Sequence, residues 1–141
     1  METSVQGVLE ACLYADDLAA AEHFYSVVIG LEVYARLAGR HVFFRCGQGM
    51  FLVFDPAATQ RGLDVRGERG RLRHGAVGPG HVAFRIDEAA LGAWRDRLAA
   101  AGVEVEADVD WPHGGRSLYV RDPAGNSVEL ATAAVWGFAT G

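Results

Sequence analysis

The chain has 141 residues, half of them apolar and 22% charged, a composition typical of a soluble globular domain rather than a disordered chain. Its formal net charge is −5 and all 13 basic residues are arginines, which argues against a nucleic-acid partner and excludes chemistry that needs a lysine, such as Schiff-base formation. Two cysteines in apolar runs, the lack of a leader-like N-terminus and the lack of a long apolar stretch predict a cytoplasmic protein without a membrane partner.

The first half of the sequence predicts the element order βαβββ. Residues 7–14 alternate and are rich in strand formers, and Asp16 and Asp17 then precede an amphipathic helical run that stops at Gly30. Three strand-like runs with glycine punctuation follow, at 31–39, 40–47 and 50–56.

The segment 56–79 separates the two halves of the chain. It is rich in arginine and glycine and shows no apolar periodicity. Loops of this length are uncommon in compact domains and often have a function. We therefore expect either a linker between two modules or a mobile lid.

The second half repeats the first. A strand at 81–87, a helical run at 88–102 and strands at 103–111, 115–123 and 125–131 follow in the same order. Residues 40–54 also align without a gap on residues 116–130, which favours an internal duplication. The sequence predicts one domain, 1–141, with modules at 7–55 and 80–131 and a tail at 132–141 that contains two aromatic residues.

Strand alternation places Glu10, His81 and Glu129 on the faces opposite the apolar sets that should pack under the helices. If the two modules join their sheets, those faces line a cleft. An inward-facing carboxylate is costly to bury without a partner, and a divalent cation would pair with all three groups. The alternative is that each residue lies in water near a strand end.

Three stretches resemble the vicinal oxygen chelate superfamily, which includes glyoxalase I, extradiol dioxygenases, fosfomycin-resistance transferases and bleomycin-resistance proteins. They are EACLYADDLAAAEHFYSVVIGLEV, GPGHVAFRID and GGRSLYVRDPAGNSVELA, the last with a DPxGNxxEL turn signature at 122–130. The resemblance implies an α+β fold in which two βαβββ modules form a glyoxalase/bleomycin-resistance/dioxygenase-type open barrel. It also implies a small-molecule substrate and a homodimer.

The same resemblance implies one divalent metal ion, although Fe, Mn, Ni, Co and Zn are not distinguished. The family takes a histidine from the first strand, a histidine from the strand opening the second module and a glutamate from the last strand. Those places hold Glu10, His81 and Glu129, so a glutamate replaces the first histidine. The fourth ligand of glyoxalase I falls on Val53, with Leu52 beside it, and neither binds a metal. This favours a three-ligand site with open positions.

The remaining candidate residues follow from the chemistry of the family. The catalytic candidates, each a possible acid or base near a bound substrate, are His41, Tyr119 and His113. Ser117 and Tyr119 match a serine and a tyrosine that line the pocket of fosfomycin transferases. The substrate-binding candidates are Phe43, Trp111, Arg116 and Ser117, whereas His23 and His74 are weaker candidates for a catalytic role.

Three functions remain open at the level of sequence, the third being a structural or regulatory module with an empty cleft. The first is a metal-dependent lyase, dioxygenase or transferase whose substrate chelates the metal through neighbouring oxygens. The second is a metal-free binding protein of the bleomycin-resistance kind, which sequesters a drug. The three metal-ligand positions favour the first, because sequestration proteins usually lose them.

Overall fold

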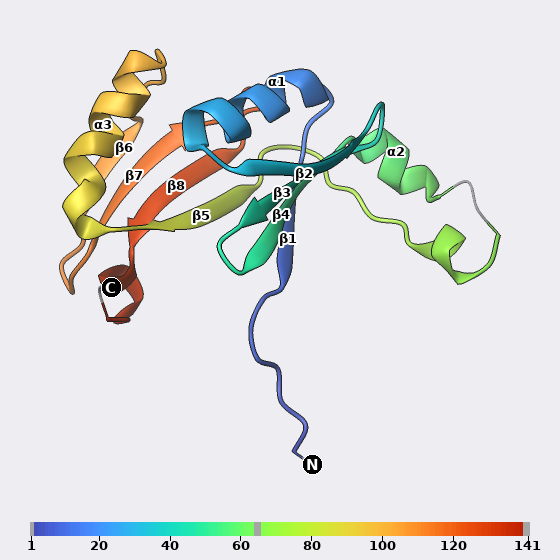
Figure 1. Cartoon of the computed structure of the whole chain (residues 1–141), viewed down its shortest axis with the longest axis horizontal. Helices are drawn as coiled ribbons and strands as arrows, with labels where there is room; N and C mark the ends of the chain where they lie inside the picture. Colours follow the sequence, from blue (N-terminus) through green and yellow to red (C-terminus); the bar gives the residue numbers. More distant parts are fainter. Residues whose placement is uncertain (1, 64–65, 140–141) are drawn as a thin grey trace. The chain divides into compact units, whose positions relative to one another are not determined.

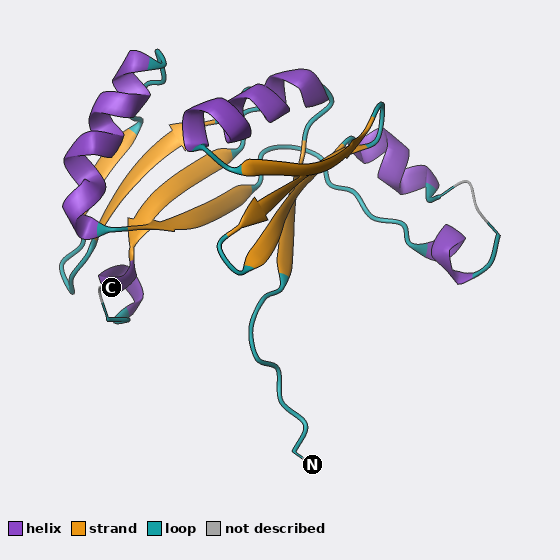
Figure 2. Cartoon of the chain, viewed as in Figure 1, coloured by secondary structure: helices purple, strands orange, loops and turns teal. Residues whose placement is uncertain are grey.

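A computed structural model describes residues 2–63 and 66–139 of the chain. The chain divides into two compact units, Met1–Val77 and Gly78–Gly141. Each unit contains a four-stranded mixed sheet and helices (Figures 1 and 2). Among the described residues, no helix combines the length and the apolar character needed to cross a bilayer.

The sheet of unit 1 has the strand order β1-β4-β3-β2. The outer strand β1 pairs with β4 in parallel, and the other neighbours are antiparallel. Two helices, α1 and α2, accompany the sheet, and α1 continues into a π-helical stretch at Phe24–Ile29. The bounds are β1 Glu10–Tyr14, α1 Leu18–His23, β2 Glu32–Leu37, β3 His41–Cys46, β4 Gly49–Phe54 and α2 Pro56–Arg61.

The first helix begins and ends where its capping residues predict. The carboxylate of Asp17, rather than that of Asp16, accepts a hydrogen bond from the Ala20 amide at 3.0 Å. Gly30 ends the π-helical stretch with a φ of 93°, which an L-residue with a side chain rarely adopts. Tyr25, which is fully buried, packs against Phe51 at a ring-centroid distance of 4.8 Å. The helix therefore covers one face of the sheet, and the other face carries Glu10.

The segment after β4 is more ordered than its lack of periodicity indicated. Asp55 caps α2 by accepting from the Ala57 amide at 2.9 Å, and Pro56 occupies the first helical turn. A short 3₁₀ turn, Glu68–Arg71, follows, and the other described residues of the segment are in loop (Figure 2). The His74 amide donates to the Thr59 carbonyl at 3.2 Å, which fixes the returning chain against α2.

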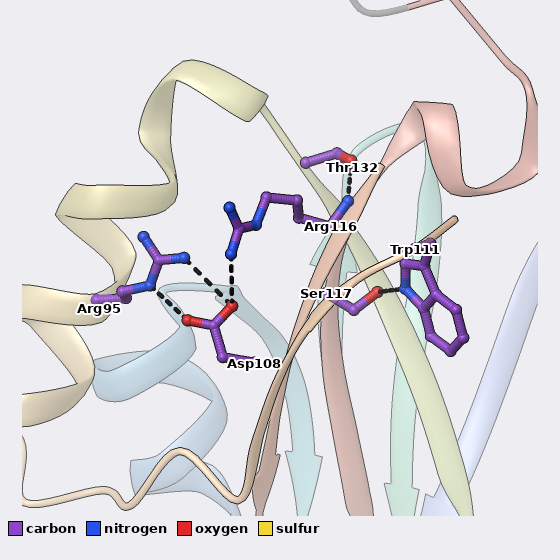
Figure 3. A network of polar contacts seen from close by, with 6 residues as sticks. All are labelled: Arg95, Asp108, Trp111, Arg116, Ser117 and Thr132. Carbon is purple, nitrogen blue, oxygen red and sulfur yellow. Dashed lines mark hydrogen bonds and ion pairs between the residues drawn. The ribbon is translucent and has the colours of Figure 1, made fainter. Parts of the chain in front are cut away.

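Unit 2 repeats the topology of unit 1, with the strand order β5-β8-β7-β6 and a parallel β5–β8 pair. Its helix α3 is joined to β6 by an ion pair between Arg95 and Asp108 at 2.8 Å (Figure 3). The two βαβββ modules of the predicted α+β fold are thus confirmed. The bounds are β5 His81–Ile86, α3 Leu91–Ala100, β6 Ala107–Asp110, β7 Arg116–Arg121 and β8 Ser127–Thr132, with 3₁₀ turns at Glu88–Ala90 and Ala133–Trp136.

The gap-free alignment of the two halves is wrong by one residue in the last strand of each module. In unit 1 Arg45 pairs with Met50, whereas in unit 2 Arg121 pairs with Ser127, so the second hairpin contains one more residue. The strand pairings therefore make Leu52, not Val53, the counterpart of Glu129. The reason is the longer turn at 122–126.

Candidate functional site

His81 and Glu129 lie together at one end of the β5–β8 pair. His81 is the first residue of β5, and Glu129 stands in the middle of the adjacent strand β8. The distance from His81 Nε2 to Glu129 Oε1 is 3.3 Å. Glu129 is 7% exposed, although it carries a carboxylate, whereas the His81 side chain is half exposed. The sequence-based pairing of these two residues on one face is therefore present within unit 2.

His81 contacts Ser127 through Nδ1 and the Glu129 carboxylate through Nε2. Nδ1 lies 3.1 Å from the Ser127 carbonyl oxygen, which accepts from the Nδ1–H tautomer, and 3.3 Å from the Ser127 hydroxyl, which can donate to the other tautomer. In the Nδ1–H tautomer of the neutral ring, Nε2 carries a lone pair and lies beside Glu129 Oε1. Two lone pairs at 3.3 Å repel each other unless a proton or a metal cation lies between them. A backbone carbonyl on the far nitrogen is also the usual support of a metal-binding histidine.

Three further side chains surround the Glu129 carboxylate. The Ser117 hydroxyl donates to Glu129 Oε2 at 2.5 Å. It also accepts from Trp111 Nε1 at 2.9 Å (Figure 3). Burial, together with hydrogen bonding and the charge of Glu129, raises the pKa of Tyr119 above its ordinary value. The Tyr119 ring also stacks on His81 at 6.3 Å. Trp111, Ser117 and Tyr119 thus join the predicted pair in one cluster.

Arg116 and His113 do not belong to this cluster. Figure 3 shows the Arg116 guanidinium on the other side of β7 from Ser117, where it lies 3.3 Å from Asp108. Arg95 pairs with the same carboxylate, and this hydrogen bond is the main reason that the pKa of Asp108 is lowered. Because side chains alternate along a strand, neighbours on β7 face opposite ways. His113 is exposed in the turn between β6 and β7.

The turn 122–126 fixes the spacing of β5 and β8. The buried Asp122 carboxylate accepts from the Ala124 and Asn126 amides at 3.0 and 2.9 Å. Asn126 in turn accepts from the Gly80 amide at 2.8 Å, directly before His81. The DPxGN turn therefore attaches the start of β5 to the start of β8.

In unit 1 the face that carries Glu10 forms a pocket of about 550 Å³. Glu10 is exposed at its edge, and the predicted substrate-binding residue Phe43 lies in its wall. Three described residues that follow α2, Leu63, Leu72 and His74, also line the pocket. The lining residues are Glu10, Tyr34, Arg40, Phe43, Arg45, Met50, Leu52, Phe54, Leu63, Leu72 and His74.

His41 stands beside this pocket, stacked on Phe43 at a centroid distance of 3.8 Å. Arg40 Nη1 lies 2.7 Å from His41 Nδ1, and a guanidinium only donates, so Nδ1 is the acceptor and Nε2 carries the hydrogen. Burial, and secondarily the charge of Arg40, lower the pKa of His41. The neutral ring therefore offers an N–H donor rather than a free base.

His74 is a pocket residue that sequence reasoning undervalued. Its Nδ1 lies 2.7 Å from the Tyr14 hydroxyl, and its ring meets Phe54 edge-on at 4.6 Å. Burial, followed by the interaction with Cys12, raises the pKa of Tyr14 to about 12, so the phenol keeps its proton and donates to His74. His74 lies in a loop, and no periodic sequence pattern indicates which loop residues will contact a sheet. Only the chemical type of the residue, a histidine, could have indicated its place in the pocket.

The C-terminal tail forms a second, smaller pocket in unit 2. It has a volume of about 420 Å³ and lies between β5, β8 and the tail residues Trp136 and Phe138. Ala83, the strand partner of Glu129, is one of its lining residues. The two exposed aromatics therefore border a pocket next to the Glu129 cluster.

Glu10 belongs to unit 1, and His81 and Glu129 belong to unit 2. Within either unit, the described residues contain no cluster of three or more histidine, cysteine, aspartate or glutamate side chains suited to a metal ion. The three-ligand set therefore stays a prediction, of which one histidine–carboxylate pair is assembled.

Comparisons with known proteins agree with the fold. The model of the Glyoxalase/Bleomycin resistance protein/Dioxygenase superfamily matches residues 7–130. A lactoylglutathione lyase from Agrobacterium tumefaciens is 46% identical, with a TM-score of 0.88 over 96% of this chain and 100% of that one. A glyoxalase-related enzyme from Fulvimarina pelagi is 26% identical (TM-score 0.69; 93% and 91% covered). The fosfomycin resistance protein FosX from Listeria monocytogenes is 21% identical (TM-score 0.66; 92% and 95% covered) and shows the fold alone. No curated protein matches the chain.

Proposed function

We propose that this chain, which belongs to the Glyoxalase/Bleomycin resistance protein/Dioxygenase superfamily, is a divalent-metal-dependent enzyme whose small substrate chelates the metal through two neighbouring oxygens. The observation that carries the proposal is the 3.3 Å contact between His81 Nε2 and Glu129 Oε1. A cation at this place would bond to both atoms, with His81 in the tautomer whose Nδ1–H donates to the Ser127 carbonyl.

The donor set suits a first-row divalent metal. His81 and Glu129 supply one nitrogen and one oxygen ligand, and Glu10 is proposed as the third ligand. A metal bound there supplies Lewis-acid stabilisation of negative charge on substrate oxygens. With three protein ligands, positions stay open for two such oxygens.

The chain's own residues supply orientation and proton transfer. Ser117 and Trp111 hold the Glu129 carboxylate in one orientation through two successive hydrogen bonds. Tyr119, whose raised pKa keeps its proton in place, is the proposed donor to a substrate oxygen. His41 Nε2–H is proposed as a second donor, beside the unit 1 pocket.

The similarity to a lactoylglutathione lyase makes that activity the first to assay. Leu52 argues against lactoylglutathione lyase activity, because this buried leucine occupies the place where the resemblance to glyoxalase I expects a fourth metal ligand. Metal-free drug sequestration is the competing function, and the aromatic lining of the unit 1 pocket favours it. We also propose a homodimer in the cytoplasm, as expected from the family resemblance.

The proposed function is tested by the metal content of protein purified without a metal-affinity tag. We expect about one equivalent of a transition metal in the wild type and its loss in Glu129→Ala and His81→Ala, because each variant removes one of the paired ligands. Elemental analysis by mass spectrometry measures the content, and the metal it finds is then used in the activity assays.

Glu104→Ala is the matched control, because Glu104 is an exposed glutamate of the same unit. It should keep the wild-type metal content. A wild type that takes up no metal from Fe²⁺, Mn²⁺, Ni²⁺, Co²⁺ or Zn²⁺ while it binds bleomycin would instead establish sequestration.

A further inference from the structure

The unit 1 pocket contains two arginines, Arg40 and Arg45, that no described carboxylate pairs with. Elsewhere in the described chain, arginines commonly have acidic partners. Arg36, Arg95 and Arg121 each place Nε within 3.0 Å of a carboxylate oxygen. The pocket arginines contact aromatic rings instead, which leaves guanidinium N–H groups available to an anion.

Arg45 is placed by an irregularity in the neighbouring strand. Its guanidinium carbon lies 4.6 Å from the centre of the Tyr34 ring. The pairing of β2 with β3 shifts between Val33 and Ala35, so Tyr34 is the extra residue of a bulge. A bulge re-aims the side chain that it carries, here onto the pocket face. Stacking fixes the guanidinium plane and leaves its edges free for bidentate contact with an acid.

Arg40 has an unsatisfied donor. Its guanidinium carbon lies 5.4 Å from the centre of the Phe54 ring, and its Nη1 donates to His41 Nδ1 at 2.7 Å. Its Nε is buried and has no hydrogen-bond partner in the described chain. Because Nε is closed to solvent, as is Arg116 Nε, an acid in the pocket would be contacted through Nη2, the guanidinium nitrogen that His41 does not use.

The two arginines stand near opposite ends of β3. Arg45 shares a strand row with Met50 and Glu10, whereas Arg40 adjoins the row of His41 and Phe54. Five residues of extended chain span roughly 16 Å, and long side chains that reach inward shorten the gap. Two acidic groups, one at each arginine, therefore pair with them better than a single acidic group does.

The apolar lining of the pocket suits a flat apolar body. It consists of Phe43, Leu52 and Phe54 from the sheet and Leu63 and Leu72 from the chain after α2. A volume of about 550 Å³ lies in the range of small-molecule sites, roughly 300–1,000 Å³.

We propose that this pocket binds an elongated dicarboxylate with an apolar or aromatic middle, one carboxylate at Arg40 and the other at Arg45. Identifying this ligand as the substrate rests on the proposed metal-dependent function, whereas the binding itself does not.

The test is calorimetric titration of the metal-stripped full chain. The probe is biphenyl-4,4′-dicarboxylate, and its monoamide is the comparison because it keeps the shape and loses one charge. We expect the diacid to bind about tenfold more tightly than the monoamide, since one charge-assisted contact is lost. Arg40→Met and Arg45→Met should each weaken diacid binding by about the same factor and abolish the preference for the diacid.

Arg61→Met is the matched control, because Arg61 is an exposed arginine of the same unit outside the pocket lining. It should bind the diacid within twofold of the wild type. Equal binding of diacid and monoamide, or equal weakening by Arg61→Met, overturns the proposal. Thermal melts, with Arg40→Lys and Arg45→Lys as milder variants, separate lost binding from lost folding. A chain that binds the diacid but takes up no metal contradicts the proposed enzyme alone.

Discussion

Ser117 connects two properties of unit 2, the burial of Glu129 and the orientation of its carboxylate. The hydroxyl is fully buried, donates to Glu129 Oε2 and accepts from Trp111 Nε1, so both its hydrogen and a lone pair are used. A buried carboxylate needs such donors, because its lost hydration must be replaced. The remaining oxygen, Oε1, then faces His81.

Ser117→Ala should lower the free energy of unfolding by about 1–3 kcal/mol, because it removes a donor from the buried Glu129 carboxylate and the acceptor of Trp111 Nε1. It should also weaken metal binding roughly 10- to 100-fold, as expected for a residue that orients a ligand. Urea denaturation and metal titration measure the two effects.

Ser26→Ala is the control that separates a general loss of a hydroxyl hydrogen bond from the loss of an orienting contact to Glu129. Ser26 donates to the Glu22 carbonyl in unit 1, so its loss removes a hydroxyl hydrogen bond far in sequence from the cluster. The control should keep wild-type metal affinity. If Ser117→Ala also keeps it, Ser117 is not an orienting residue.

The β7–β8 turn is the element that most directly sets the geometry of the cluster. The Asp122 carboxylate accepts from two backbone amides and from the Asn126 side-chain amide, and Asn126 bonds the residue before β5. Two strands distant in sequence are thereby held in register at their first residues. The turn is one residue longer than its counterpart in unit 1, which moves Glu129 and not Val128 onto the face with His81.

Asp122→Ala should destabilise the chain by about 2–3 kcal/mol, because several buried donors lose their acceptor at once. Equilibrium urea unfolding provides the measurement. Asp110→Ala, which removes an exposed carboxylate at the end of β6, should change stability by less than about 0.5 kcal/mol. Equal midpoints for the two variants would show that the turn contributes little.

At the scale of the whole molecule, the proposed site needs both units, since Glu10 belongs to the first and His81 and Glu129 to the second. Glu10 is exposed and lines the unit 1 pocket. The requirement for a ligand from each unit is a prediction that metal titration can test.

Glu10→Ala should weaken metal binding at least tenfold while stability changes by less than about 0.5 kcal/mol, because an exposed side chain contributes little to folding. Glu2→Ala, an exposed glutamate of the same unit, should behave as the wild type in both measurements. Undiminished metal binding by Glu10→Ala would restrict the site to unit 2.

The sequence by itself determined the order of the elements and the pairing of His81 with Glu129. Alternation, a capping aspartate and helix-ending glycines act within a few residues, so they can be read without knowledge of the fold. The DPxGN turn was readable for the same reason.

Only the tertiary structure decided which residues meet across the chain. It placed Arg116 on the α3 side, brought His74 to the unit 1 pocket, and left Arg40 and Arg45 without acidic partners. Partner choice depends on strand register and on where a loop returns, and a single extra residue in a turn changes the register. Local patterns carry no record of such long-range contacts, and for that reason they emerge only from the folded chain.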